Sequence, residues 1–107
     1  MKLAERLKLI SGAANLLDTK SDSAHVKLEP TGGWECNVTD KEGELVDLFD
    51  TDERACTTGY SSPGEAVVEM ERVMIKKLTL ERKNAEARLN SVVMTLERLE
   101  KNERDEQ

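Results

Sequence analysis

A single long helix at the C-terminal end constrains this chain more than any other feature. Ser62 can cap the helix, Pro63 suits the first helical position, and Glu65 completes a capping box. A helix from Ser62 to about Glu103 would be roughly 60 Å long, whereas a compact domain of this size is about 25–30 Å across. The helix must therefore protrude, fold back on another helix, or be covered by a second copy of the chain. All three outcomes concern assembly rather than chemistry.

A heptad pattern runs along this helix from Ile75 onward, with Arg82 at one a position and Ala85 at one d position. In a parallel dimer Glu81 would face Glu86 of the partner, and the two carboxylates would repel. The pattern therefore favours antiparallel packing, higher-order packing, or docking of the first helix onto the seam. We expect homo-oligomers to form through an apolar seam that consists of Ile75, Leu78, Ala85, Leu89, Val92, Leu96 and Leu99.

The remaining sequence predicts an α+β fold in a single domain: an N-terminal helix, a three-stranded antiparallel β-meander and the long coiled-coil-like helix. Helical periodicity covers Lys2–Leu17, and alternation of apolar and polar residues then predicts strands at His25–Glu29, Trp34–Thr39 and Leu45–Phe49. Thr57–Tyr60 is a candidate short fourth strand. The expected boundaries are residues 1–18 (helix), 24–50 (meander), 51–61 (loop), 62–103 (long helix) and 104–107 (frayed tail).

Composition limits the classes of function. Of the 107 residues 36% are charged and only 3% aromatic, which predicts a small core supplemented by helix packing. The net charge of −6 argues against bulk affinity for nucleic acid or for an anionic membrane, since both need basic surfaces. No apolar run approaches the ~18 residues of a membrane span. Cys36 and Cys56 have no metal-ligand spacing, and we expect reduced thiols and a cytoplasmic setting.

The sequence offers little catalytic chemistry. His25 is the single histidine and lies on the polar side of a predicted strand, without a nucleophile-elbow motif anywhere in the chain. Asp50 and Asp52 begin like a calcium loop, but Arg54 takes the next ligand position and the required glycine is missing. We therefore expect no enzyme, no cofactor and no metal site.

Two binding sites are predicted outside the seam. The first is an acidic patch that could dock on a basic partner surface, made of Glu42, Glu44, Asp47, Asp50, Asp52 and Glu53. The second is a possible anion or ligand site at the start of the long helix, where free backbone N–H groups attract negative charge. Its hydroxyls are Thr57, Thr58, Ser61 and Ser62, although helix capping explains the same residues.

A basic band on the long helix and the side chain of Trp34 leave open a third possibility, binding of single-stranded nucleic acid. The band consists of Lys76, Lys77, Arg82, Lys83 and Arg88. Glu81 and Glu86 are interleaved with it, so pairing within the helix is the commoner explanation. Trp34 is likewise more typical of a core residue in a chain with so few aromatics.

The strands followed by Gly59-Tyr60-Ser61-Ser62-Pro63-Gly64-Glu65-Ala66 resemble small proteins of phages and mobile elements, including the sheet-plus-helix half of HicB-type antitoxins. The resemblance covers about Trp34 to Met74, whereas the N-terminal helix and the long C-terminal extension depart from the antitoxin pattern. It implies a small, acidic, non-enzymatic phage accessory protein in the cytoplasm of a bacterial host cell, one that blocks a host defence or host enzyme. The alternatives are an oligomer that sequesters a nucleotide-like small molecule and a single-stranded nucleic-acid binder.

Overall fold

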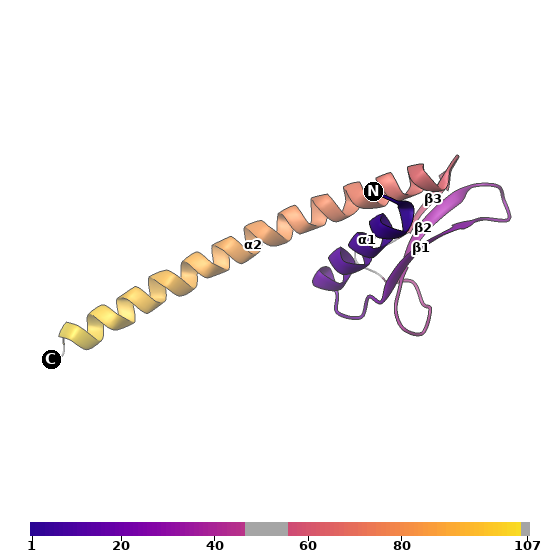
Figure 1. Ribbon diagram of the computed structural model, residues 1–107. Coiled ribbons are helices and arrows are strands. Elements are labelled where there is room, and N and C mark those ends of the chain that lie inside the picture. The colour runs from indigo at the N-terminus through magenta and orange to yellow at the C-terminus, as the bar shows by residue number, and fades with distance from the viewer. Residues whose placement is uncertain (47–55, 106–107) are drawn as a thin grey trace.

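The computed structural model has the expected α+β architecture (Figure 1). It describes residues 1–46 and 56–105, apart from the side chains of residues 56–58. Helix α1 comes first and the long helix α2 comes last, with three described strands between them. Their bounds are α1 Leu3–Leu17, β1 Ser23–Leu28, β2 Trp34–Thr39, β3 Cys56–Tyr60 and α2 Pro63–Asp105.

The described strands form one antiparallel sheet in the order β1-β2-β3. Ala24 pairs with Val38 and Val26 with Cys36, so the apolar side chains of β1 and β2 share one face. His25 pairs with Asn37 on the opposite, polar face. The alternation in the sequence therefore gave the orientation of both strands correctly.

The strand predicted at Leu45–Phe49 can be followed only in its first two residues. Leu45 forms an isolated bridge with Thr39, and the N–H of Val46 donates to the carbonyl of Val38 at 3.1 Å. The rest of the expected strand, residues 47–49, lies outside the described residues. The third strand of the described sheet is instead β3, which includes the segment predicted as a candidate fourth strand.

A close backbone approach explains why β3 fits beside β2. Gly59 in β3 has φ +81°, a conformation that other residues rarely adopt. A Cβ atom added at Gly33 would lie only 2.7 Å from the Cα of Gly59. The ladder is also irregular between Trp34 and Cys36. Two glycines therefore allow the β2–β3 pairing at a place where strand propensity is weak.

The core lies between the apolar face of the sheet and the two helices. Helix α1 turns the apolar residues Leu3, Leu7, Ile10, Ala14 and Leu17 inward, and the first turns of α2 pack on the sheet. Ser11 links α1 to the sheet edge, because its hydroxyl accepts the N–H of Ala24 at 2.8 Å. The buried apolar residues are Ile10, Ala14, Cys36, Val38, Val46, Ala66, Val67, Met70 and Met74.

The molecule is far from spherical, because α2 continues well beyond the small body formed by α1 and the sheet (Figure 1). The extents are 73 × 27 × 25 Å, and the radius of gyration is 19.6 Å. A compact domain of this length would have a radius of gyration of about 13 Å. In the described part of the chain, neither helix has an apolar stretch long enough to cross a lipid bilayer.

Candidate functional site

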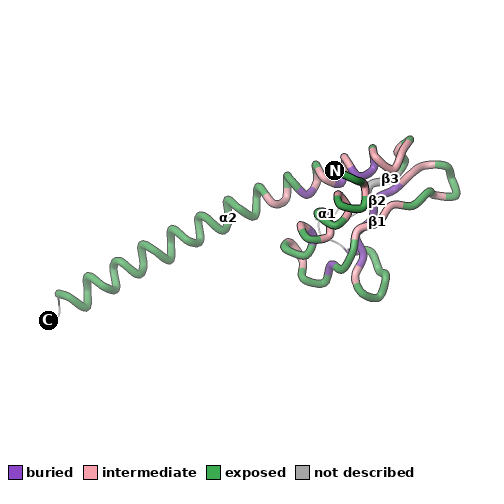
Figure 2. The backbone as a smooth tube through the Cα atoms, in the orientation of Figure 1, coloured by how far each residue is buried: buried purple, intermediate pink, exposed green. Residues whose placement is uncertain are grey.

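The C-terminal part of α2 is the most unusual surface of the molecule. Every residue from Glu81 to Asp105 is exposed, whereas the first turns of the same helix are partly buried (Figure 2). Apolar side chains of the predicted seam lie open there, with Leu89 61%, Leu96 53% and Leu99 62% exposed. An exposed apolar stripe of this length is the main candidate for an interaction surface in the described structure.

Residues 81–105 of α2, which we call the extension, are helical for local reasons, because few contacts with the rest of the molecule support them. Residues 81–105 contain no glycine or proline, and Arg82 lies 3.9 Å from Glu86 in a weak i,i+4 ion pair. Helices without tertiary contacts are only marginally stable in water, because most helix stability in proteins comes from packing of one face. The extension therefore lacks the packing that would normally hold such a segment helical.

The apolar residues of the extension are not distributed evenly around it. The seam positions follow the heptad a and d spacing, and Val93 lies beside them at an e position. Leu80 and Met94 are also exposed but fall at f positions, on the opposite side of the helix. The seam is thus a defined stripe, and Met94 provides an apolar reference position outside it.

The first layer of the predicted seam has a different environment from the rest. Ile75 and Leu78 line a groove between the two helices together with Leu9, Ile10 and Ala13 of α1. Leu78 is half-buried there, while Ile75 remains 65% exposed. Docking of α1 onto the seam, one of the expected alternatives, is thus realised only at this first layer.

An ion pair fixes the position of α1 against α2. The guanidinium of Arg6 donates to both carboxylate oxygens of Glu71, with a distance of 3.2 Å from Nε to Oε2. The hydrogen bond from Arg6 lowers the pKa of Glu71 below its ordinary value, although partial burial opposes this shift. This contact holds α1 along the same face of α2 that carries the seam.

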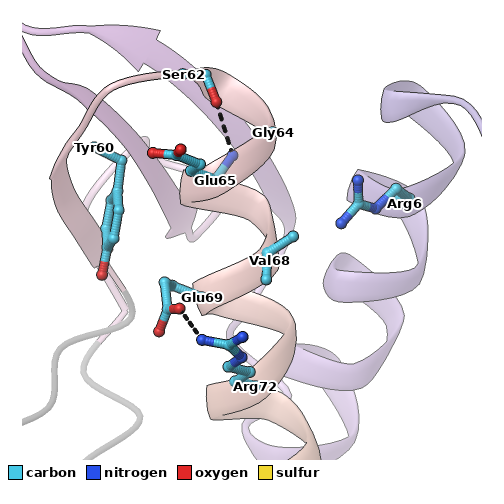
Figure 3. Close-up of a pocket in the computed structure, with 8 residues that line it drawn as sticks. All are labelled: Arg6, Tyr60, Ser62, Gly64, Glu65, Val68, Glu69 and Arg72. Atoms are coloured by element: carbon cyan, nitrogen blue, oxygen red, sulfur yellow. Dashed lines mark hydrogen bonds and ion pairs between the residues drawn. The ribbon is translucent and has the colours of Figure 1, made fainter.

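The start of α2 is capped as the sequence predicts (Figure 3). The hydroxyl of Ser62 accepts the N–H of Glu65 at 3.1 Å. In return, the Glu65 carboxylate accepts the hydroxyl of Ser61 at 2.6 Å and its N–H at 3.3 Å. The reciprocal half of the capping box is therefore made to Ser61 rather than to Ser62. Both serines predicted as anion ligands are used in this cap.

A hollow of about 560 Å³ lies beside this cap. Its two basic side chains already have acidic partners, since Arg6 pairs with Glu71 and Arg72 with Glu69. The residues around it are Arg6, Tyr60, Ser62, Gly64, Glu65, Val68, Glu69 and Arg72 (Figure 3). The side chains of Thr57 and Thr58 lie outside the described residues. The anion site stays a prediction, and the carboxylates of Glu65 and Glu69 at the hollow do not favour a negatively charged ligand.

The described part of the acidic patch lies in the loop after β2. Glu42 and Glu44 are exposed, and the N–H groups of both donate to the carboxylate of Asp40 at 2.9 Å. This turn holds the two glutamates outward at the loop. The other predicted members, Asp47, Asp50, Asp52 and Glu53, lie outside the described residues.

The polar face of the sheet contains a network that sequence patterning missed. Glu35, Asn37 and Thr39 of β2 are buried, although alternation predicts exposed side chains at these positions. The amide of Asn37 donates to Glu35 at 2.8 Å, and the ammonium of Lys27 lies 3.1 Å from the same carboxylate. The Asn37 Oδ1 atom is buried without a hydrogen-bond partner.

The electrostatics of this network centre on Glu35. Burial alone would raise its pKa, but hydrogen bonds from Glu29, Asn37 and Lys27 lower it below the ordinary value. The hydrogen bond between Glu29 and Glu35 is also the main cause that raises the pKa of Glu29. Within the described residues, no group of three or more histidine, cysteine, aspartate or glutamate side chains could hold a metal ion. We therefore regard the network as a structural feature of the sheet.

The exposed seam on α2 is the feature of the described structure that most needs a partner. It offers apolar area and a charge pattern, but no reactive group. Comparison of the chain with protein-family models, with curated proteins and with solved structures finds no match.

Proposed function

We propose that this chain is a non-enzymatic binding protein that works as a homo-oligomer, assembled through α2. The observation that supports the proposal most is the apolar stripe of Leu89, Val92, Leu96 and Leu99, exposed on a helix that protrudes from its own body. A stripe of this kind is favourable only when another surface covers it.

The charge distribution favours a second copy as that covering surface. Residues 81–105 carry six basic and six acidic side chains, so the extension is neutral and the whole net charge of −6 resides in the rest of the chain. Two extensions can therefore approach each other without net repulsion. A strongly charged partner helix would gain no comparable attraction from a neutral surface.

The energy available from the seam predicts a reversible assembly. Burying the remaining exposed area of the four side chains contributes about 1 kcal/mol each, or about 8 kcal/mol for a pair of copies. Association itself costs several kcal/mol in lost translational and rotational freedom. We therefore expect oligomers that dissociate on dilution rather than a permanent complex.

The body is the part that would hold a different partner. It is acidic, and Glu42 and Glu44 stand exposed at the loop after β2. A protein with a basic surface fits this charge. In the setting that the resemblance to phage accessory proteins implies, this partner is a host protein whose activity is inhibited in the bacterial cytoplasm.

Two other functions remain as alternatives with less support. A nucleotide-like ligand would have to place its phosphates near the carboxylates of Glu65 and Glu69, which line the hollow beside the helix cap. A single-stranded nucleic acid would have to bind the basic band, which has five basic and two acidic residues between Lys76 and Arg88, in a chain whose net charge is −6. The hollow does not concentrate positive charge as phosphate binding requires, and the band is short and interrupted by Glu81 and Glu86.

Native mass spectrometry of the full chain purified from bacterial cells tests the proposal and its alternatives together. The proposal predicts a multiple of 12.0 kDa without a bound small molecule. An oligomer that retains a discrete small-molecule mass would shift the conclusion to ligand sequestration. A species of monomer mass at every protein concentration would contradict assembly through α2.

A further inference from the structure

We infer that two copies pair antiparallel through their extensions in one register, with Leu89 of each copy facing Val92 of the other. The inference rests on the proposed self-association and adds the orientation and alignment of the partner. It follows from three features of the described residues: the position of α1, the charges that flank the seam, and the sizes of the seam side chains.

A parallel dimer conflicts with all three features. Equivalent residues would face each other, so Arg82 would oppose Arg82 and Ala85 would oppose Ala85, giving one repulsive layer and one poorly filled layer. Glu81 would also face Glu86 of the second copy. In addition, each α1 lies along the seam face of its own α2 near Glu71 and Leu78, so two such helices would crowd the same end of the dimer.

In an antiparallel pair, each a residue faces a d residue, and e positions face e positions while g positions face g positions. Seam layers can align only in steps of one heptad. Three alignments bring most of the seam together, with Ala85 facing Leu89, Leu96 or Glu103 of the second copy. The flanking charges and the position of α1 distinguish these three.

The alignment of Ala85 with Leu89 fails on both criteria. It places Glu86 against Glu86 and Arg88 against Arg88 at the centre of the pair. It also lays residues 96–105 of the second copy over residues 69–78, beside which Leu9, Ile10 and Ala13 of α1 line the groove between the two helices. The alignment of Ala85 with Glu103 avoids α1 but sets Glu86 against Glu100. Like charges in these flanking positions are destabilising.

The alignment of Ala85 with Leu96 avoids the like-charge pairs and most of the overlap with α1. Its flanking pairs join Arg88 with Thr95 and Glu86 with Val93, so no like charges face each other. The small side chain of Ala85 is matched with the large one of Leu96, which evens out the volume of the layers. Only residues 103–105 of the second copy lie over residues 76–78, the last part of α2 that has α1 beside it.

This alignment gives the polar seam residue Arg82 a partner. Arg82 faces Leu99 of the second copy and lies almost level with Glu100 of that copy, on the same side of the interface. Within one chain these two residues are 18 positions apart, roughly 27 Å along the helix, and cannot touch. Each dimer would contain two such pairs. The two bodies would lie roughly 60 Å apart at opposite ends of the rod, which makes the dimer bivalent.

Disulfide trapping of the full chain tests the orientation and the alignment. Chains with Leu96→Cys are mixed with chains that carry Ala85→Cys, Leu78→Cys or Val92→Cys, and covalent dimers are counted after mild oxidation. We expect Leu96→Cys to cross-link chiefly with Ala85→Cys, because only that pair is opposed. The unaltered chain, with its Cys36 and Cys56, gives the background, and each variant alone gives the self-pairing control.

The outcomes separate the inference from the proposal on which it rests. Self-pairing of Ala85→Cys would indicate a parallel dimer, and preferred pairing of Leu96→Cys with Leu78→Cys or Val92→Cys would indicate another alignment. Each of these results would overturn the inference and leave self-association intact. A chain that stays monomeric in sedimentation would instead overturn the proposed function itself.

A charge exchange gives an independent readout without new cysteines. Arg82→Glu should weaken dimerisation about tenfold, since it replaces two favourable pairs by two repulsive ones. Addition of Glu100→Arg to the same chain should restore most of the affinity. Arg98→Glu, a matched reversal at an outward-facing position, should leave the affinity unchanged. Absence of rescue by Glu100→Arg would count against the alignment.

Discussion

Truncation of one seam side chain predicts a measurable loss of assembly. Leu96 is 53% exposed, so about half of its area remains to be buried by a partner. Leu96→Ala removes three carbon atoms, each worth about 0.8 kcal/mol when fully buried, or about 1.2 kcal/mol per chain at half burial. A dimer contains two such sites and loses about 2.4 kcal/mol, which raises its dissociation constant about 50-fold.

Met94→Ala is the matched control. Met94 is 54% exposed, lies two residues away on the same helix, and faces the opposite side. Both substitutions introduce alanine, which slightly favours the helix, so changes in helix propensity act in the same direction for the two variants. We therefore expect Met94→Ala to leave the dissociation constant within a few-fold of that of the unaltered chain.

Sedimentation equilibrium over a range of protein concentrations measures both dissociation constants. Circular dichroism at high concentration checks that the two variants remain folded. Equal effects of the two substitutions would show that exposed apolar area in general, rather than the seam, drives association. An unchanged dissociation constant for Leu96→Ala would refute the reasoning from the stripe.

Three further predictions concern the body. Gly12→Ala should stabilise the fold by about 0.5–1 kcal/mol, because Gly12 lies within α1 and a Cβ there meets no atom within 4 Å; a lower urea midpoint would contradict this. Gly33→Ala should instead destabilise the fold by about 1–3 kcal/mol, since its Cβ would lie 2.7 Å from the Cα of Gly59. An unchanged urea midpoint for this variant would show that the close approach of Gly33 to Gly59 is unimportant for stability. For Glu71, whose pKa is lowered by Arg6, the ion pair should contribute fully above the unfolded pKa of about 4.3 and be lost as the pH falls through the lower folded value. Glu71→Gln should therefore lower the free energy of unfolding at neutral pH and weaken its decrease with falling pH in this range. Urea unfolding at several pH values measures this, and identical pH profiles for the variant and the unaltered chain would exclude a stabilising role of the ion pair.

Local signals explain why most of the fold could be predicted from the sequence. Ser62 and Pro63 place the start of α2 correctly, because capping depends on a few neighbouring residues. Periodicity also locates α1 and the two strands of the first hairpin. The strand β3 was expected only as a candidate fourth strand, since its pairing depends on the distant approach of Gly59 to Gly33. Such a contact leaves no local pattern in either segment.

The candidate site was predicted in part for similar reasons. The seam is visible as a heptad repeat, and the exposure of Leu89, Leu96 and Leu99 could not be known without the position of α1. The hydroxyls of Ser61 and Ser62 were assigned to two possible roles, and the structure uses them in the cap. Burial of Glu35 and Asn37 was missed, because alternation identifies a polar face but does not say what lies over it.

Hydrogen–deuterium exchange of the full chain at low and high concentration tests the central claim most directly. Assembly through α2 predicts that amides of residues 81–105 exchange quickly in dilute solution and become protected at high concentration, while those of α1 and β2 change little. Protection confined to the body, with residues 81–105 exchanging rapidly at every concentration, would contradict the account.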